Sequence, residues 1–149
     1  MKARLFADGG SRGNPGPAAG GAVLFAEDGT VLREIGEYVG IATNNVAEWR
    51  GLLAGLEAAL ELGVEELAIR LDSELVVRQL TGVYRVKHPD LIPLAARARR
   101  LLARLRSVDI AHVRRKENAA ADAVVNRVLD EKAANAAAAH SFRAGPGAV

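Results

Sequence analysis

The most locally specified stretch of the sequence is Asp8-Gly9-Gly10-Ser11-Arg12-Gly13-Asn14-Pro15-Gly16-Pro17. It follows residues 2–7, which have the composition of a strand, so we expect its single carboxylate to lie where a strand ends. Strand ends deliver side chains into a crevice, and glycines permit unusual backbone angles and close approach of a ligand. The same residue types also form an ordinary hairpin turn. From this stretch alone, both interpretations stay open.

Composition limits the class of protein. The chain has 149 residues, of which 50% are hydrophobic, and it contains neither a membrane-spanning run nor a signal peptide. We therefore expect one soluble domain with a buried core, no contact with a membrane and no obligate protein partner. The absence of cysteine is typical of a reducing compartment and predicts a cytoplasmic protein. The net charge is only +2, so nucleic-acid binding must depend on where the charges lie.

The hydrophobic periodicity predicts an α/β fold with a five-stranded mixed sheet, three antiparallel strands followed by two parallel ones, flanked by helices. The expected strands are residues 2–8, 18–27, 30–40, 65–72 and 108–114. The expected helices are residues 43–62, 73–80, 88–106 and 118–134. We expect residues 1–132 to form the domain and residues 133–149 to be a flexible tail or the start of a linker.

Four carboxylates recur at the junctions between these elements: Asp8, Glu48, Asp72 and Asp122. The last three also have structural interpretations, as helix caps or as charges that complement a helix dipole. If the first and fourth strands are parallel neighbours, however, all four carboxylates converge at one edge of the sheet. Two carboxylates about 4 Å apart repel by on the order of 4 kcal/mol at an effective dielectric of about 20, so such a cluster points to divalent cations. Oxygen ligands favour magnesium or manganese over zinc.

Four stretches of the sequence resemble the motifs of type 1 ribonuclease H, in the order in which that family has them. They are DGGSRGNPGPAAGGAV, TNNVAEWRGLLAGLEAALELG, DSELVVRQL and ENAAADAVVNRVLD, and they extend to about residue 131. The resemblance implies a ribonuclease H-like fold. It also implies an endonuclease that hydrolyses the RNA strand of RNA/DNA hybrids, leaving 5′-phosphate and 3′-hydroxyl ends. By the same resemblance Asp8, Glu48, Asp72 and Asp122 hold two Mg²⁺ ions, for which Mn²⁺ substitutes, and Asp8 bridges them.

The resemblance also implies which residues bind the substrate. Recognition of the RNA 2′-hydroxyl falls on the glycine-rich stretch and the asparagine pair, here Ser11, Gly13, Asn14, Asn44 and Asn45. For the asparagines, helix capping is the alternative. Thr43 matches the threonine of the family's phosphate pocket, but Ile41 stands where the family often has its arginine partner.

The sequence departs from the better-known bacterial pattern in two places. It has no extra basic helix after Asp72, and residues 113–118 run directly from strand to helix without the family's histidine loop. Arg115 is our candidate to replace that histidine in phosphate contact, although a solvated run of charges is the alternative. We expect His112 to be structural. The alternative functions are a noncatalytic nucleic-acid-binding domain and another nuclease of the same fold.

Overall fold

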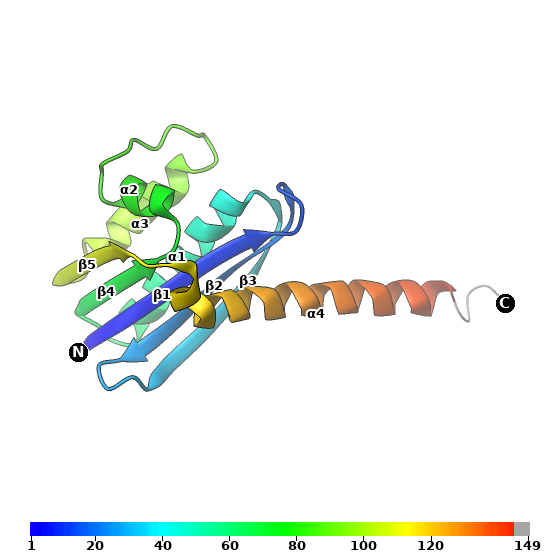
Figure 1. The fold of residues 1–149 in the computed structure, drawn as a ribbon, viewed down its shortest axis with the longest axis horizontal. Helices are drawn as coiled ribbons and strands as arrows, with labels where there is room; N and C mark the ends of the chain where they lie inside the picture. The colour runs from blue at the N-terminus through cyan, green and yellow to red at the C-terminus, as the bar shows by residue number, and fades with distance from the viewer. Residues whose placement is uncertain (145–149) are drawn as a thin grey trace.

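The computed structural model of the chain describes the backbone of residues 1–144 and the side chains of residues 1–139. Its centre is one five-stranded sheet with the order β3-β2-β1-β4-β5 (Figure 1). The strands β1 (Lys2–Ser11), β2 (Gly16–Ala26) and β3 (Val31–Ala42) are antiparallel. The strands β4 (Glu66–Leu71) and β5 (Ser107–His112) run parallel to β1. The predicted mixed sheet is confirmed.

Helices cover both faces of this sheet. One layer contains α1 (Asn44–Glu61), α2 (Glu74–Leu80) and α3 (Ile92–Leu102). The short 3-10 turn η1 (Arg115–Asn118) leads into α4 (Ala119–Ala144), which packs against the opposite face and then continues beyond the sheet (Figure 1). The alternation of β1 places these layers: Gly9 faces the backbone of α1, while Gly10 faces Val125 of α4.

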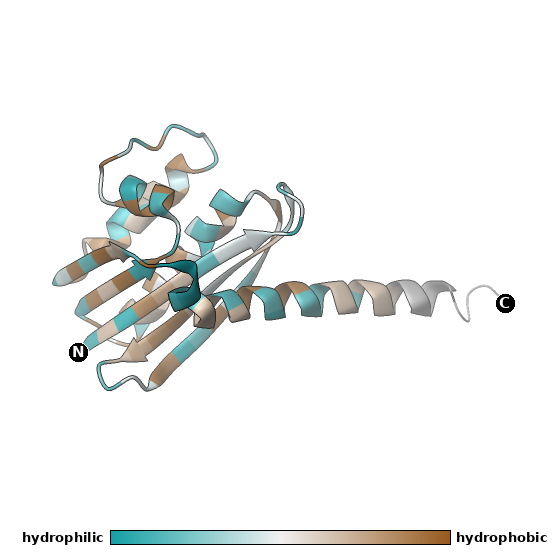
Figure 2. Ribbon diagram, viewed as in Figure 1, coloured by the Kyte–Doolittle hydropathy of each residue, from teal (hydrophilic) through white to brown (hydrophobic). Residues whose placement is uncertain are grey.

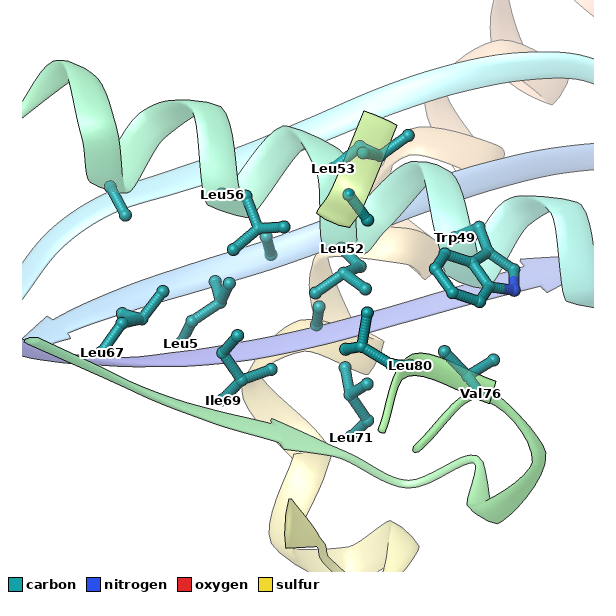
Figure 3. Packing of buried hydrophobic residues seen from close by; sticks show 14 of the residues in the cluster. Leu5, Trp49, Leu52, Leu53, Leu56, Leu67, Ile69, Leu71, Val76 and Leu80 are labelled. Atoms are coloured by element: carbon teal, nitrogen blue, oxygen red, sulfur yellow. The ribbon is translucent and has the colours of Figure 1, made fainter. Parts of the chain in front are cut away.

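The main core lies between the sheet and α1. Leu5, Trp49, Leu52, Leu56 and Ile69 are each 0% exposed and pack together (Figure 3). Along β4 buried and half-buried residues alternate, and the hydropathy of the strand alternates with them (Figure 2). A smaller cluster of Ala19, Val125 and Leu129 joins α4 to the other face. The core therefore fixes the position of both long helices against β1 and β2.

Several predicted boundaries were wrong, with the largest differences in the first strand, the third helix and the last helix. The first strand continues to Ser11, so only residues 12–15 of the glycine-rich stretch lie outside the strands. The helix predicted for residues 88–106 spans only Ile92–Leu102, because residues 88–91 form a turn in which His88 O accepts from Leu91 N and Ile92 N.

The last helix continues to Ala144 rather than ending near residue 134, in keeping with the high helix propensity of its alanines. The part of the predicted tail at residues 145–149 lies outside the described residues. Among the described residues, no helix combines the length and the apolar character that crossing a membrane requires.

Candidate active site

Two of the four carboxylates are brought together by the parallel pairing of β1 and β4. Ala7 is the register partner of Leu71, so Asp8 and Asp72 follow at adjacent positions of neighbouring strands. Asp8 is only 9% exposed. The predicted convergence of these two side chains is therefore confirmed.

Glu48 reaches the same place because α1 lies almost directly on the backbone of β1. A Cβ atom added at Gly51 would overlap the carbonyl oxygen of Asp8, and one added at Gly9 would overlap the backbone of Ala47 and Glu48. Only glycine permits this separation. The glycines at positions 9 and 51 thus set the distance between the strand that carries Asp8 and the helix that carries Glu48.

Asp122 is positioned by a buried asparagine. Asn118 is 0% exposed, and its Nδ2 donates a hydrogen bond of 2.9 Å to the carbonyl oxygen of Ala7. This bond holds the start of the last helix beside the end of β1, and Asp122 follows one turn later. Asn126 Nδ2 then donates to the Oδ2 of Asp122 at 3.3 Å.

The four carboxylates line a single pocket of about 580 Å³. Ser11, Arg12, Asn44, Ser73, Arg115 and Asn126 also contribute to its wall. Among the side chains of residues 1–139, however, no group of three or more His, Cys, Asp or Glu residues is arranged to hold a metal ion.

Burial and repulsion between neighbouring charges raise the pKa of two of these carboxyl groups. Burial, and next the charge of Asp72, raises the pKa of Asp8 from 3.8 to about 7. Burial also raises the pKa of Glu48 from 4.5 to about 7, although a hydrogen bond with Ser73 opposes the shift. A bound cation would favour the ionised form of both groups, because it places positive charge beside them.

A groove of about 480 Å³ adjoins the pocket and shares Asn44, Glu48 and Ser73 with it. Asn14, Thr43 and Asn45 also line this groove, whereas Gly13 lines neither cavity and instead takes a positive φ of 90° in the turn. Six of the seven predicted substrate residues therefore lie along one continuous depression: Ser11, Asn14, Thr43, Asn44, Asn45 and Arg115.

Hydrogen bonds within the groove distinguish structural from available groups. Asn44 Oδ1 accepts from Ser11 N at 2.8 Å, and Asn14 Oδ1 accepts from Asn44 N at 3.1 Å, so the two amides join the β1–β2 turn to α1. Thr43 is the N-cap of α1 and accepts from Val46 N, so neither asparagine occupies the N-cap position, although Asn14 accepts from the first N–H of that helix. The side-chain NH₂ groups of Asn14 and Asn44 make no hydrogen bond among the described residues. The hydroxyl of Ser11 donates to Ala42 O at 2.8 Å and is thereby used structurally.

Three polar or charged residues of the pocket wall were missed in the sequence analysis: Arg12, Ser73 and Asn126. Ser73 directly follows Asp72, and Asn126 lies one helical turn after Asp122. Their spacing from these two carboxylates could therefore have identified both residues in the sequence. Arg12 forms an ion pair of 2.6 Å with Asp130, 118 positions later, which no local pattern indicates. His112 lies at the end of β5 with its Nε2 3.2 Å from the carbonyl oxygen of Asp72.

The chain is similar in sequence to known proteins. The chain is 50% identical over 139 residues to the bifunctional protein Rv2228c of Mycobacterium tuberculosis, covering 93% of this chain and 38% of that protein. It is 46% identical over 130 residues to ribonuclease HI of Halobacterium salinarum, covering 87% of this chain and 65% of that protein. The chain therefore spans less than two thirds of the length of either relative.

Solved structures share the fold. The N-terminal RNase H domain of Rv2228c matches 85% of this chain with a TM-score of 0.83 at 49% identity, and 98% of that chain is covered. RNase H1 of Halobacterium salinarum matches 88% of this chain with a TM-score of 0.85 at 46% identity, and 99% of that chain is covered. LC11-RNase H1 in complex with an RNA/DNA hybrid matches 87% of this chain with a TM-score of 0.82 at 40% identity, and 98% of that chain is covered.

The family model described as reverse transcriptase-like matches residues 6–128, which include all four carboxylates. These likenesses confirm the ribonuclease H-like fold that the motifs predicted. Because the family model covers most of the chain, and because ribonuclease HI and the RNase H1 structures are similar to it over most of its length, the chain belongs to the type 1 ribonuclease H family.

Proposed function

We propose that the chain is an endonuclease that hydrolyses the RNA strand of RNA/DNA hybrids with the help of two divalent cations. The observation that carries this proposal is the meeting of Asp8, Glu48, Asp72 and Asp122, from four separate parts of the chain, in one pocket that adjoins an asparagine-lined groove. The likeness to ribonuclease HI and to an RNase H1 bound to RNA/DNA hybrid supports it.

The donor set suits magnesium, with manganese as a substitute. The pocket wall offers carboxylates and contains neither histidine nor cysteine, and such oxygen ligands prefer hard cations. The charges of Asp72 and Asp122 both act on Asp8, so Asp8 would share in holding the cations with either neighbour. When bound, two such ions supply an activated water and charge stabilisation for an in-line displacement, which leaves 5′-phosphate and 3′-hydroxyl ends.

The chain's own residues bind and orient the substrate. The free NH₂ groups of Asn14 and Asn44 are donors at the groove, suited to a 2′-hydroxyl that accepts. Thr43 lies beside them for a phosphate of the DNA strand, while Ile41, 71% exposed, offers no charge there. Arg115 brings a guanidinium to the pocket wall for a phosphate of the RNA strand.

The direct test is cleavage of a labelled RNA/DNA hybrid with and without magnesium. Asp8→Asn and Asp72→Asn should each lower kcat at least about a thousandfold while hybrid binding and the fold persist. The control is Asp109→Asn, since Asp109 is an exposed residue of β5 that pairs with Arg70 outside the pocket. Undiminished cutting by both active-site variants would reject the proposal, and binding without any cutting by the wild type would favour the noncatalytic alternative.

Substrate discrimination has a separate test. Asn14→Ala should reduce the preference for hybrid over DNA duplex, because it removes a donor to the 2′-hydroxyl. Arg115→Ala should slow turnover and flatten the salt dependence of binding without changing that preference, because phosphate contacts position a substrate but do not distinguish its sugar. Binding of both duplexes across a salt series measures the two effects. Wild-type behaviour of Arg115→Ala would show that residues 114–116 are only a solvated run of charges.

A further inference from the structure

The catalytic pocket contains two arginines, and the sequence analysis assigned a role to only one of them, Arg115. Arg115 comes from η1, whereas Arg12 comes from the turn between β1 and β2. Both reach a wall otherwise dominated by four carboxylates. A phosphodiester strand that crosses such a wall is repelled by the carboxylates, so a fixed cation beside its path has a clear electrostatic role.

Arg12 is held in place from α4. Its Nη2 lies 2.6 Å from Oδ1 of Asp130. Asp122, Asn126 and Asp130 are spaced four residues apart and therefore share one face of the helix. Asp122 and Asn126 line the pocket, and Asp130 lies about 12 Å farther along the helix axis than Asp122. The guanidinium of Arg12 is thus held at the far end of the row of side chains that begins with a catalytic carboxylate.

The pair is poorly explained as a stabilising contact. Its side chains are 43% and 70% exposed, and exposed pairs contribute little to stability. A guanidinium carries five N–H donors in a planar fork, and the contact with Asp130 uses one of them. The remaining donors are available for a phosphate, with the two-pronged geometry that arginine provides.

We propose that Arg12 is a substrate-binding residue that contacts a phosphate of the RNA strand next to the cleaved one, and that Asp130 is a positioning residue that holds its guanidinium there. The strand is the RNA strand because Arg12 lies in the pocket where cleavage takes place. This inference rests on the proposed function, and it adds a contact that neither the acidic quartet nor the asparagine-lined groove provides.

The experiment compares cleavage and binding of a short labelled hybrid by Arg12→Ala, Arg12→Lys, Asp130→Asn and the double variant. Arg12→Ala should raise KM about 5- to 10-fold with little change in kcat, because the contact is the same in substrate and transition state. The slope of log affinity against log salt should fall by about 0.7 to 0.9, the loss of one phosphate contact. Arg12→Lys should restore the salt slope and part of the KM, since it keeps the charge without the fork.

Asp130→Asn should raise KM about 2- to 3-fold in the wild-type background and have no effect once Arg12 is alanine. The matched control is Arg33→Ala. Arg33 pairs with Glu61 at the same 2.6 Å, with side chains 39% and 67% exposed, but it lies outside the pocket. It should leave KM and the salt slope unchanged, and the melting temperatures of Arg12→Ala and Arg33→Ala should be similar.

If the wild type cuts the hybrid and Arg12→Ala behaves like Arg33→Ala in KM and salt slope, the inference is wrong while the proposed function stands. If Asp130→Asn instead lowers KM, Asp130 competes with the phosphate and its positioning role is refuted. A wild type that neither binds nor cuts the hybrid rejects the proposed function itself, which separates the two failures.

Discussion

Asp8 makes the stability of the cation-free protein depend on pH. Its pKa is about 7 in the folded protein and near 3.8 when unfolded, so between these values the folded state binds the additional proton. Stability contributed by this group is therefore full below pH 4 and is lost as the pH rises toward 7. The loss is on the order of 2 to 4 kcal/mol, because one pKa unit corresponds to about 1.4 kcal/mol.

Asp8→Asn should remove this pH-dependent loss of stability, because asparagine does not ionise. In the presence of a chelator the variant should melt at the wild-type temperature near pH 4 and at least about 4 °C above it at pH 7.5. Asp90→Asn makes the same chemical change at an exposed position and should show no such trend. Thermal unfolding from pH 4 to 8 measures the difference. A difference that does not grow with pH would mean that Asp8 ionises normally in the folded state.

The raised pKa values of Asp8 and Glu48 predict that metal binding releases protons. Asp8 and Glu48, each with a pKa of about 7, are partly protonated at neutral pH and must ionise to hold a cation. Titration of magnesium by calorimetry at pH 7, in two buffers of different ionisation enthalpy, should show a net release of about one proton, falling toward zero at pH 8.5. Equal heats of binding in both buffers at pH 7 would contradict this expected release of protons. Glu48→Gln should reduce the release.

At the scale of the elements, the packing of α1 on β1 depends on close contact between their backbones. A Cβ atom at Gly9 would overlap the backbone of Ala47 and Glu48, whereas one at Gly10 would meet only Val125 Cγ1 at an ordinary 3.5 Å. Gly9→Ala should therefore cost about 1 to 3 kcal/mol or more, while Gly10→Ala should cost little. Thermal unfolding with a chelator compares the two, and equal melting temperatures would show that α1 can shift without strain.

The elements also show what the sequence could and could not reveal. Periodicity predicted all five strands and α1, because apolar residues recur at regular spacing where one face is buried. It misplaced the helix after residue 88, where a turn with its own backbone hydrogen bonds precedes the helix. The four carboxylates could be singled out because each was expected at the end of a strand or near the start of a helix, although β1 in fact continues past Asp8 to Ser11. The contact of Asn118 with Ala7 and that of Arg12 with Asp130 join distant positions, and only the folded chain brings them together.

At the scale of the whole molecule, α4 divides into a packed part and a projecting part. Val125 and Leu129 are buried against the sheet, and Lys132 lies over the ring of Tyr38 at 4.7 Å. Residues 133–139 are exposed on a helix that extends away from the sheet (Figure 1). An exposed helix contributes little to the stability of the domain, because most helical stability comes from packing.

A chain that ends at Lys132 should therefore keep its melting temperature within about 2 °C and its rate of hybrid cleavage. A chain that ends at Asn126 serves as the control. It loses Val128 and Leu129 from the smaller core cluster and should be destabilised by at least about 2 to 5 kcal/mol, because a buried leucine is removed and the sheet face beneath it is uncovered. Thermal unfolding and hybrid cleavage of both truncated chains measure these effects. A loss of stability in the chain that ends at Lys132 would show that residues 133–149 pack against the domain and that its boundary lies beyond residue 132.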